Sequence, residues 1–166
     1  MIHQHKKNIS SNQGKIIISL ENLPQELIQD IVKIAKSIGI RSIAIVGGLV
    51  RDELINNLQE NNFQNARDLD LVVEGSATNL ANALKNSLGA SRVSSLQIHN
   101  LYNTAEMKID GFPVDLATAR LEEYKEPGQN PIITSSSLKK DLSRRDFTIN
   151  AMAIDLEDMS LLDPLG

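Results

Sequence analysis

Apolar residues recur at helical spacing in the first well-patterned part of the chain, residues 24–38. Leu27, Ile31 and Ile34 fall on one side of a helix, which is the pattern of an amphipathic helix packed on a core. A proline opens the segment and Gly39 follows it, and both are typical of helix boundaries. The pattern therefore predicts a helix over 24–38.

The pattern of apolar and polar positions predicts a series of further elements along the chain. These are a strand at 42–46, a helix over 49–58, a strand at 69–73, a helix at 77–88 after the N-cap Ser76, strands at 104–109 and 112–117, a helix at 138–146 and a strand at 151–156. Residues 56–65 and 120–137 are polar or rich in turn residues and are predicted to be loops. We expect a flexible N-terminal segment at 1–22 and one domain at 23–166, because the first residues show no periodicity.

The dipeptide Asp110-Gly111 separates two of the predicted strands. Such a pair is a strong signal of a tight hairpin, so the sheet must be at least partly antiparallel. Helices and strands otherwise intermingle, which favours a mixed sheet with helices packed on one face. The predicted fold class is therefore α+β.

Composition narrows the class of protein. The chain has 166 residues, of which 41% are hydrophobic, so it can form a packed core. It has no cysteine, which excludes thiolate metal sites, and no apolar run that could cross a bilayer, so we expect no membrane contact and a cytoplasmic location. The net charge of −4 and 3% aromatic residues argue against a basic or stacking nucleic-acid surface within this chain. Oligomeric state is left open.

The first candidate site is the pair Asp68 and Asp70 at the strand predicted for 69–73. Residues two apart in a strand point the same way, so both carboxylates leave one face while Leu69 and Leu71 enter the core. At roughly 4 Å and an effective dielectric of about 20, two such charges repel by about 4 kcal/mol. A hard cation such as Mg²⁺ turns this repulsion into attraction, although paired aspartates on a strand are more often simply solvated.

Asp115 is a third carboxylate, and it alternates with Val114 and Leu116 on the second strand of the predicted hairpin. It shares the polar face with Asp70 if the two strands are neighbours. Three carboxylates on adjacent strands can hold two Mg²⁺ ions about 3.5–4 Å apart, as in polymerases. A strand residue that merely faces water is an equally good interpretation of the spacing.

Two further segments combine features that suit phosphate binding. Gly47 and Gly48 join an apolar strand to a helix, whose free N–H groups and partial positive charge attract a phosphate that Arg51 can also contact. Residues 141–153 concentrate arginines, carboxylates and an amide, but on the spacing alone a charged helix end with pairs such as Asp141 with Arg145 is the better explanation.

Together these segments resemble the class II tRNA nucleotidyltransferases and bacterial poly(A) polymerases. The motifs occur in order: GGLVRD at 47–52, RDLDLVVEG at 67–75, PVDLATAR at 113–120 and RRDFTINAMA at 144–153. The resemblance covers residues 23–160, and the last motif is its most specific part. It implies a polymerase-beta-like palm with a mixed, mainly antiparallel sheet of about five strands and helices on one face.

The resemblance also implies roles for individual residues. Asp68, Asp70 and Asp115 would be the catalytic, Mg²⁺-binding carboxylates. The residues that would bind nucleotide are Gly47, Gly48, Arg51, Asp52, Arg144, Arg145, Asp146 and Asn150. The implied reaction adds nucleotides from CTP or ATP to an RNA 3′ end, that of tRNA, through attack of the 3′-hydroxyl on the α-phosphate with release of pyrophosphate.

Several alternatives stay open on the sequence. Family members have a flexible loop at the place of residues 121–138, where Tyr124 and Pro131 are typical of A-adding enzymes, but CCA-, CC- and A-addition all fit. A poly(A) polymerase acting on other RNAs, a transferase acting on small molecules or proteins, and a non-catalytic nucleotide-binding module are the other candidates. Family members continue into neck, body and tail domains that select the base and grip tRNA, so we expect this chain to be the head domain alone.

Overall fold

The computed structural model describes residues 9–12, 15–18, 20, 23–59, 68–126 and 128–166. Its helices are α1 (Gln25–Ser37), α2 (Gly48–Gln59), α3 (Ala77–Leu88), α4 (Leu138–Ser143) and the single 3-10 turn η1 (Thr148–Asn150). Its strands are β1 (Ile9–Asn12), β2 (Lys15–Ile18), β3 (Ile43–Val46), β4 (Leu69–Val73), β5 (Val93–His99), β6 (Thr104–Ile109), β7 (Phe112–Thr118), β8 (Arg120–Glu123), β9 (Ile132–Ser135), β10 (Ala153–Asp155) and β11 (Leu161–Leu162).

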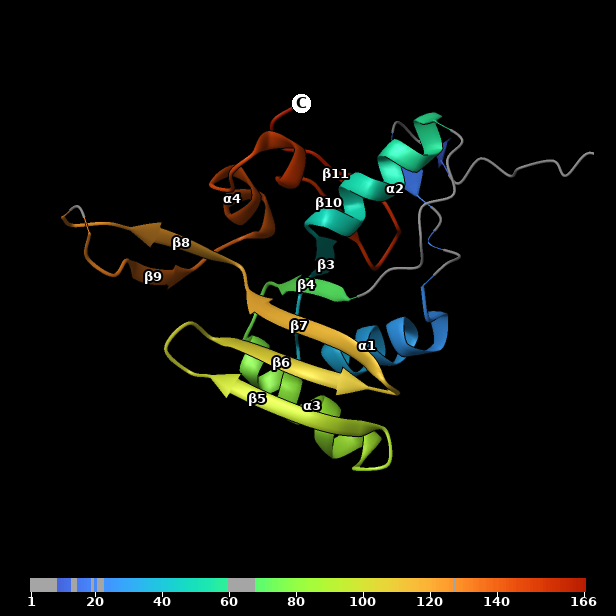
Figure 1. Cartoon of the computed structure of the whole chain (residues 1–166), viewed down its shortest axis with the longest axis vertical. Coiled ribbons are helices and arrows are strands. Elements are labelled where there is room, and N and C mark those ends of the chain that lie inside the picture. The colour runs from blue at the N-terminus through green and yellow to red at the C-terminus, as the bar shows by residue number, and fades with distance from the viewer. Residues whose placement is uncertain (1–8, 13–14, 19, 21–22, 60–67, 127) are drawn as a thin grey trace, which may run out of the picture.

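The central sheet has seven strands in the order β11-β10-β3-β4-β7-β6-β5 (Figure 1). Only β4 and β7 run parallel, and every other neighbouring pair is antiparallel. The predicted α+β class and the mixed, mainly antiparallel sheet are therefore confirmed. The sheet is larger than the expected five strands because β5 and β11 extend its two edges.

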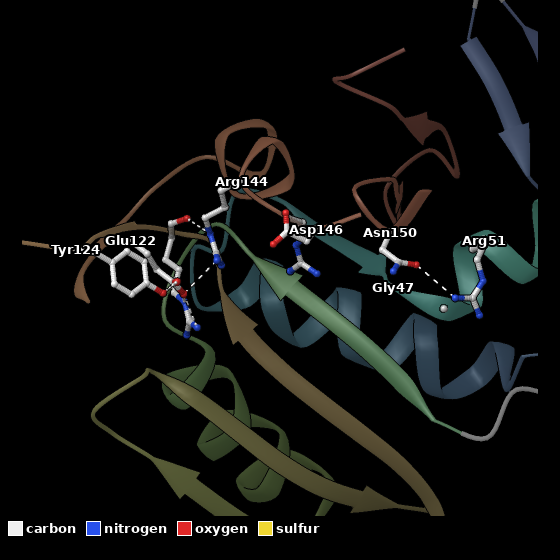
Figure 2. Close-up of a pocket in the computed structure, with 10 residues that line it drawn as sticks. Gly47, Arg51, Glu122, Tyr124, Arg144, Asp146 and Asn150 are labelled. Carbon is white, nitrogen blue, oxygen red and sulfur yellow. Dashed lines mark hydrogen bonds and ion pairs between the residues drawn. The ribbon is translucent and has the colours of Figure 1, made fainter. Parts of the chain in front are cut away.

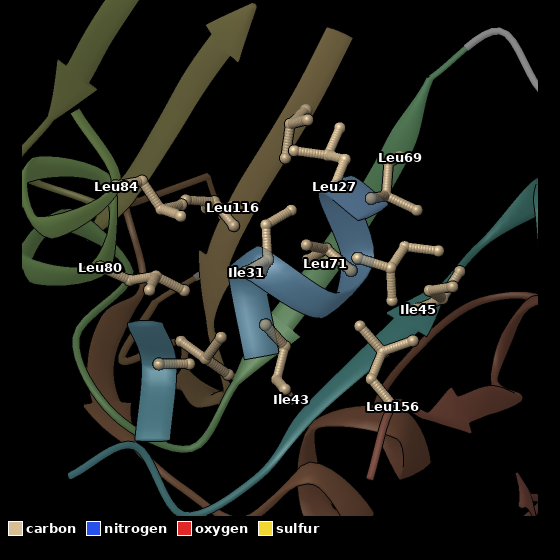
Figure 3. Close-up of a cluster of buried hydrophobic side chains, with 14 of the residues drawn as sticks. Leu27, Ile31, Ile43, Ile45, Leu69, Leu71, Leu80, Leu84, Leu116 and Leu156 are labelled. Carbon is tan, nitrogen blue, oxygen red and sulfur yellow. The ribbon is translucent and has the colours of Figure 1, made fainter. Parts of the chain in front are cut away.

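Helices α1 and α3 cover one face of this sheet and form the main core (Figure 3). The apolar side of α1, including Leu27 and Ile31, packs over Ile45 of β3 and Leu71 of β4. Alternation along the strands sends these side chains to the helix-covered face and leaves their neighbours for the other. The main core thus fixes which residues of β4 and β7 face the opposite side.

A second, smaller cluster lies on the opposite face, where α4 packs. Leu138 and Leu142 of α4 contact Val46 and Val72 in this cluster. The expectation of helices on one face thus describes α1 and α3, while α4 covers part of the other face. Its position leaves the opposite face of β4, β7 and β6 open for polar side chains.

Local signals in the sequence explain where two elements begin and turn. Asp110 and Gly111 have φ values of 52° and 81° and join β6 to β7, as the tight hairpin predicted there requires. The hydroxyl of Ser76 accepts a hydrogen bond from the Asn79 amide, and α3 starts at the next residue, Ala77. Both predictions are confirmed.

Three segments differ from the sequence-based expectation. Within the predicted flexible segment 1–22, β1 pairs with β2, and the core includes Ile18 and Leu20. The predicted loop at 120–137 contains β8 and β9, which pair as an antiparallel ribbon. Helix α2 continues to Gln59, into the loop predicted at 56–65, and residues 60–65 lie outside the described part of the chain.

Among the residues that the structure describes, no helix is long and apolar enough to cross a bilayer.

Replacing Leu71 with alanine is expected to lower the free energy of unfolding of this chain by about 2–5 kcal/mol. The side chain is 1% exposed at the centre of the main core, so its removal leaves a cavity. Urea unfolding followed by circular dichroism measures the change. The matched control is Leu101→Ala, because Leu101 is 76% exposed and its loss should change stability by less than about 0.5 kcal/mol. Equal effects of the two substitutions would contradict this assignment of the core.

Candidate active site

Three carboxylates form a row across β4, β7 and β6. Asp70 is the register partner of Asp115 in the parallel β4–β7 pair, and Asp115 is in turn the partner of Glu106 on β6. All three point away from the main core, because Leu71 and the other flanking residues of these strands are buried in it. The prediction that Asp70 and Asp115 share one face on adjacent strands is therefore confirmed.

These three residues, Asp70, Asp115 and Glu106, form a carboxylate row that is electrostatically unfavourable on its own. Burial raises the pKa of Asp70 above its usual value, and the nearby charges of Asp68 and Asp115 raise it further, while Arg145 lowers it. Burial also raises the pKa of Asp115, followed by repulsion from Glu106 and Asp68. A cation beside these groups would reverse the repulsion.

The carboxylates lie on neighbouring strands, but their oxygens are not arranged as the ligands of one metal ion. Within the described ranges, no group of three or more histidine, cysteine, aspartate or glutamate side chains lies in a metal-binding arrangement. The donor set nevertheless fits Mg²⁺, which prefers hard oxygen ligands and binds through one or two carboxylates together with substrate phosphates. Asp70 and Asp115 supply such oxygens from one face, with Asp68 just before β4.

The turn between β3 and α2 brings the backbone close to this row. Gly47 has a φ of 79°, a left-handed conformation that favours glycine. A β-carbon at this position would lie 3.2 Å from Oδ2 of Asp70. Glycine is therefore required here for two reasons, the backbone conformation and the close approach of the carboxylate.

Replacing Gly47 with alanine is expected to lower the rate of any reaction catalysed at this candidate site by about 10²-fold, because small displacements of a reacting group are costly. The left-handed conformation should also cost about 1–2 kcal/mol of stability. Gly89→Ala is the matched control, since Gly89 has a φ of 75° but a β-carbon there would meet nothing within 4 Å. Steady-state kinetics with melting curves separates the two effects. Equal activity of the two variants would show that the approach to Asp70 is unimportant.

An open cavity of about 810 Å³ lies beside the Gly47 turn (Figure 2). Seven of the eight residues predicted to bind nucleotide line it: Gly47, Gly48, Arg51, Arg144, Arg145, Asp146 and Asn150. Three separate segments, the β3–α2 turn, the end of α4 and η1, supply these residues. The fold thus brings together motifs that are about 100 residues apart in the sequence.

Asp52 is the predicted nucleotide-binding residue that does not line the cavity. Its Oδ1 accepts from Nε of Arg51 at 2.7 Å and pairs with Nη2 at the same distance. Nη1 of Arg51 donates to Oδ1 of Asn150 at 3.4 Å, so Arg51 spans from Asp52 to η1 (Figure 2). Asp52 therefore binds Arg51, which lines the cavity, but does not itself line it.

Helix α4 places Arg144 and Arg145 at the cavity, and two caps fix its start. The Ser137 hydroxyl accepts from the Lys140 amide, and Oε1 of Glu74, which follows β4, accepts from the Leu138 amide at 2.7 Å. The second bond ties α4 directly to the strand that carries Asp70. The arginines and the carboxylates are thus anchored to one scaffold.

The β8–β9 ribbon adds three cavity residues that the sequence did not predict as site residues: Arg120, Glu122 and Tyr124. Oε1 of Glu122 lies 2.8 Å from Nη2 of Arg120 and 3.1 Å from Nη1 of Arg144. Burial acts to raise the pKa of Glu122, but bonds from Tyr124 and Arg120 and the charge of Arg144 outweigh it and lower that pKa. Glu122 is therefore a stable anion inside an arginine-rich wall, and no local signal in the sequence marks it.

The cavity adjoins the carboxylate row. A second, smaller hollow of about 300 Å³ is lined by Asp70, Glu106 and Asp115, and it shares Gly47 and Arg145 with the larger one. An anionic ligand in the arginine-lined cavity would thus reach the carboxylates past Gly47 and Arg145. This arrangement suits phosphate chemistry, in which cations balance the charge that carboxylates and phosphates share.

The fold is similar to the folds of solved tRNA-processing nucleotidyltransferases. A tRNA nucleotidyltransferase solved with a primer tRNA and an incoming ATP analogue is 40% identical, with a TM-score of 0.62 over 82% of this chain and 34% of that one. A CCA-adding enzyme in an apo form has a TM-score of 0.69 at 37% identity over 86% of this chain. The model of the poly(A) polymerase head domain matches residues 43–166, so the chain belongs to that family.

Curated relatives agree with this family. The A-adding tRNA nucleotidyltransferase of Aquifex aeolicus is 43% identical over 74% of this chain, and that of Halalkalibacterium halodurans is 33% identical over 99%. A CC-adding enzyme of Deinococcus radiodurans is 38% identical over 75%. The chain spans only 14%, 37% and 31% of the length of these three relatives.

Proposed function

We propose that the protein adds nucleotides to the 3′ end of tRNA, using ATP or CTP. The observation that carries the proposal is the shared border of two sites: an arginine-lined cavity on one side of Gly47 and a carboxylate row on the other. The names of the relatives, which include A-adding and CC-adding tRNA nucleotidyltransferases, supply the substrate class. A cytoplasmic location agrees with this substrate.

The arginine-lined cavity is proposed to hold the triphosphate. Arg51, Arg144 and Arg145 present guanidinium groups, which bind phosphate oxygens in a bidentate geometry. The backbone N–H groups at the start of α2 add partial positive charge beside Gly48. These groups would orient the α-phosphate toward the carboxylate row and balance charge on the departing pyrophosphate.

The carboxylate row is proposed to receive the RNA 3′ end. Asp68, Asp70 and Asp115 would hold Mg²⁺, which when bound lowers the pKa of a coordinated hydroxyl and stabilises developing negative charge on phosphate oxygens. The 3′-oxygen forms a bond to the α-phosphorus, and the bond from that phosphorus to the β-bridging oxygen breaks, so pyrophosphate leaves with the electron pair. Asp115 would accept the hydroxyl proton.

Incorporation of labelled nucleotide tests this function in the intact protein. We expect ATP to be added to tRNA that lacks its terminal A, in line with the A-adding relatives, and EDTA to abolish the reaction. Addition of CTP to tRNA ending before CCA would assign CC- or CCA-addition instead. Long tails on unrelated RNA would assign a poly(A) polymerase. No incorporation into any RNA, with ATP binding unaffected by EDTA, would contradict the proposal.

A further inference from the structure

The most buried charged group near the nucleotide cavity is Asp141, which is 1% exposed on α4. Its Oδ1 accepts from Nε and Nη2 of Arg144 at 3.2 and 2.7 Å. Its Oδ2 accepts from Nε of Arg145 at 3.0 Å and lies 2.9 Å from Nη2 of the same residue. Each carboxylate oxygen therefore binds the Nε–Nη2 edge of one guanidinium group, and this fixes the planes of both guanidinium groups.

The same carboxylate reaches the root of the β8–β9 ribbon. Oδ1 of Asp141 also accepts from the Arg120 amide at 3.1 Å, and Nε of Arg144 donates to the Arg120 carbonyl at 2.9 Å. Arg120 is the first residue of β8. Its amide is thus bound by Asp141, and its carbonyl is bound by Arg144. The position of the ribbon wall, with Glu122 facing Arg144, depends on this contact.

Two roles for Asp141 give opposite expectations. If it only offsets positive charge, its removal would leave a more positive cavity and tighten the binding of a triphosphate. If it aims the guanidinium groups, its removal would release two long side chains, and each would have to be ordered again when the nucleotide binds. The geometry favours the second role, since both guanidinium groups keep part of their surface at the cavity, with 26% and 23% of the side chains exposed.

We propose that Asp141 is a positioning residue for nucleotide addition. It aims Arg144 and Arg145 into the cavity and fixes the root of the ribbon that lines the cavity beside them. This inference rests on the proposed function, because it assigns a role within the same site. It differs from a purely structural role in that it acts on the binding of the nucleotide by the folded protein.

The test is Asp141→Asn in the full-length protein, with ATP incorporation into tRNA as the assay. Asparagine has nearly the same shape but lacks the charge, so we expect KM for ATP to rise about tenfold or more in the folded variant. The fall of velocity with added salt should be steeper than in the unmodified protein, because the loosened arginines are screened more easily. Asp110→Asn is the control, since Asp110 binds Arg92 in a similar ion pair away from the cavity and its loss should leave KM unchanged.

The outcomes separate the alternatives. An unchanged or lower KM in the folded variant would overturn the proposal. A fall in kcat with unchanged KM, in proportion to a loss of folded protein in the melting curve, would assign a structural role and overturn it too. If the unmodified protein incorporates no nucleotide into any RNA, the proposed function itself has failed, which is distinct from either result.

A measurement on the unmodified protein covers the case in which the variant does not fold. The Nη2–H signal of Arg144 and the Nε–H signal of Arg145 in nitrogen-edited NMR spectra report the bonds to Asp141. We expect both to be narrow and protected from solvent exchange, and to stay so when ATP is added. Loss of either signal on ATP binding would mean that Asp141 releases the arginine, and the proposal would be wrong.

Discussion

Replacing Asp70 with asparagine is expected to lower kcat for the proposed nucleotide addition by about 10³-fold or more, because loss of the proposed metal ligand would remove several kcal/mol of transition-state stabilisation. Asp70 lies at the centre of the site: it is the register partner of Asp115, it lies close to Gly47, and it lines the smaller hollow with Arg145. Single-turnover incorporation of labelled ATP into tRNA measures the effect. Asp30→Asn, on α1 at the other face of the sheet, is the control and should keep full activity.

The same substitution should leave the melting temperature unchanged or raise it. The pKa of Asp70 in the folded chain is raised, so its ionised form opposes folding at neutral pH. Stability of the unmodified chain should therefore increase as pH falls through that pKa, and the difference from Asp70→Asn should shrink. A variant that loses activity only because it unfolds would contradict this account.

Replacing Arg145 with alanine is expected to lower kcat/KM by about 10²-fold, the scale of losing one well-placed donor to a developing charge. Arg145 is shared by the two hollows, and its charge opposes the rise in the pKa of Asp70. The loss of Arg145 should therefore weaken nucleotide binding, which raises KM. It should also remove a positive charge beside the carboxylate row, which lowers kcat.

Steady-state kinetics across ATP concentrations separates these two parameters. The control is Arg92→Ala, because Arg92 is also bound by two aspartates, Asp30 and Asp110, but lies outside both hollows. A change in KM alone for Arg145→Ala would place it at the triphosphate without a role beside the carboxylates.

The sequence predicted the elements whose signals are local. The strand at 69–73 and the helix at 77–88 match β4 and α3 in both bounds, because a short, mostly apolar run marks the strand and the Ser76 cap marks the start of the helix. β5 was not predicted, since a register shift between Val93 and Ser95 breaks its alternation and most of its residues are polar. The β8–β9 ribbon was predicted as a loop because the stretch 120–137 is polar and contains proline and glycine.

Among the site residues, too, those marked by a local sequence motif were predicted and those that depend on the folded chain were not. The motif RRDFTINAMA at 144–153 indicated Arg144 and Arg145 as nucleotide-binding residues, which stays a prediction. The alternative interpretation, an ion pair of Asp141 with Arg145, is confirmed. The two interpretations are compatible because one edge of the guanidinium serves the pair while the residue still lines the cavity. Glu122 was not predicted, because its partner Arg144 is more than 20 residues away and only the folded ribbon brings them together.

The most direct test of the central claim is the position of a bound divalent cation. Crystals of the protein grown with Mn²⁺ and a non-hydrolysable ATP analogue would reveal it by anomalous scattering. We predict a peak between Asp70 and Asp115 beside Gly47, with the phosphates of the analogue against Arg144 and Arg145. A peak elsewhere, or phosphates bound away from this cavity, would contradict the account.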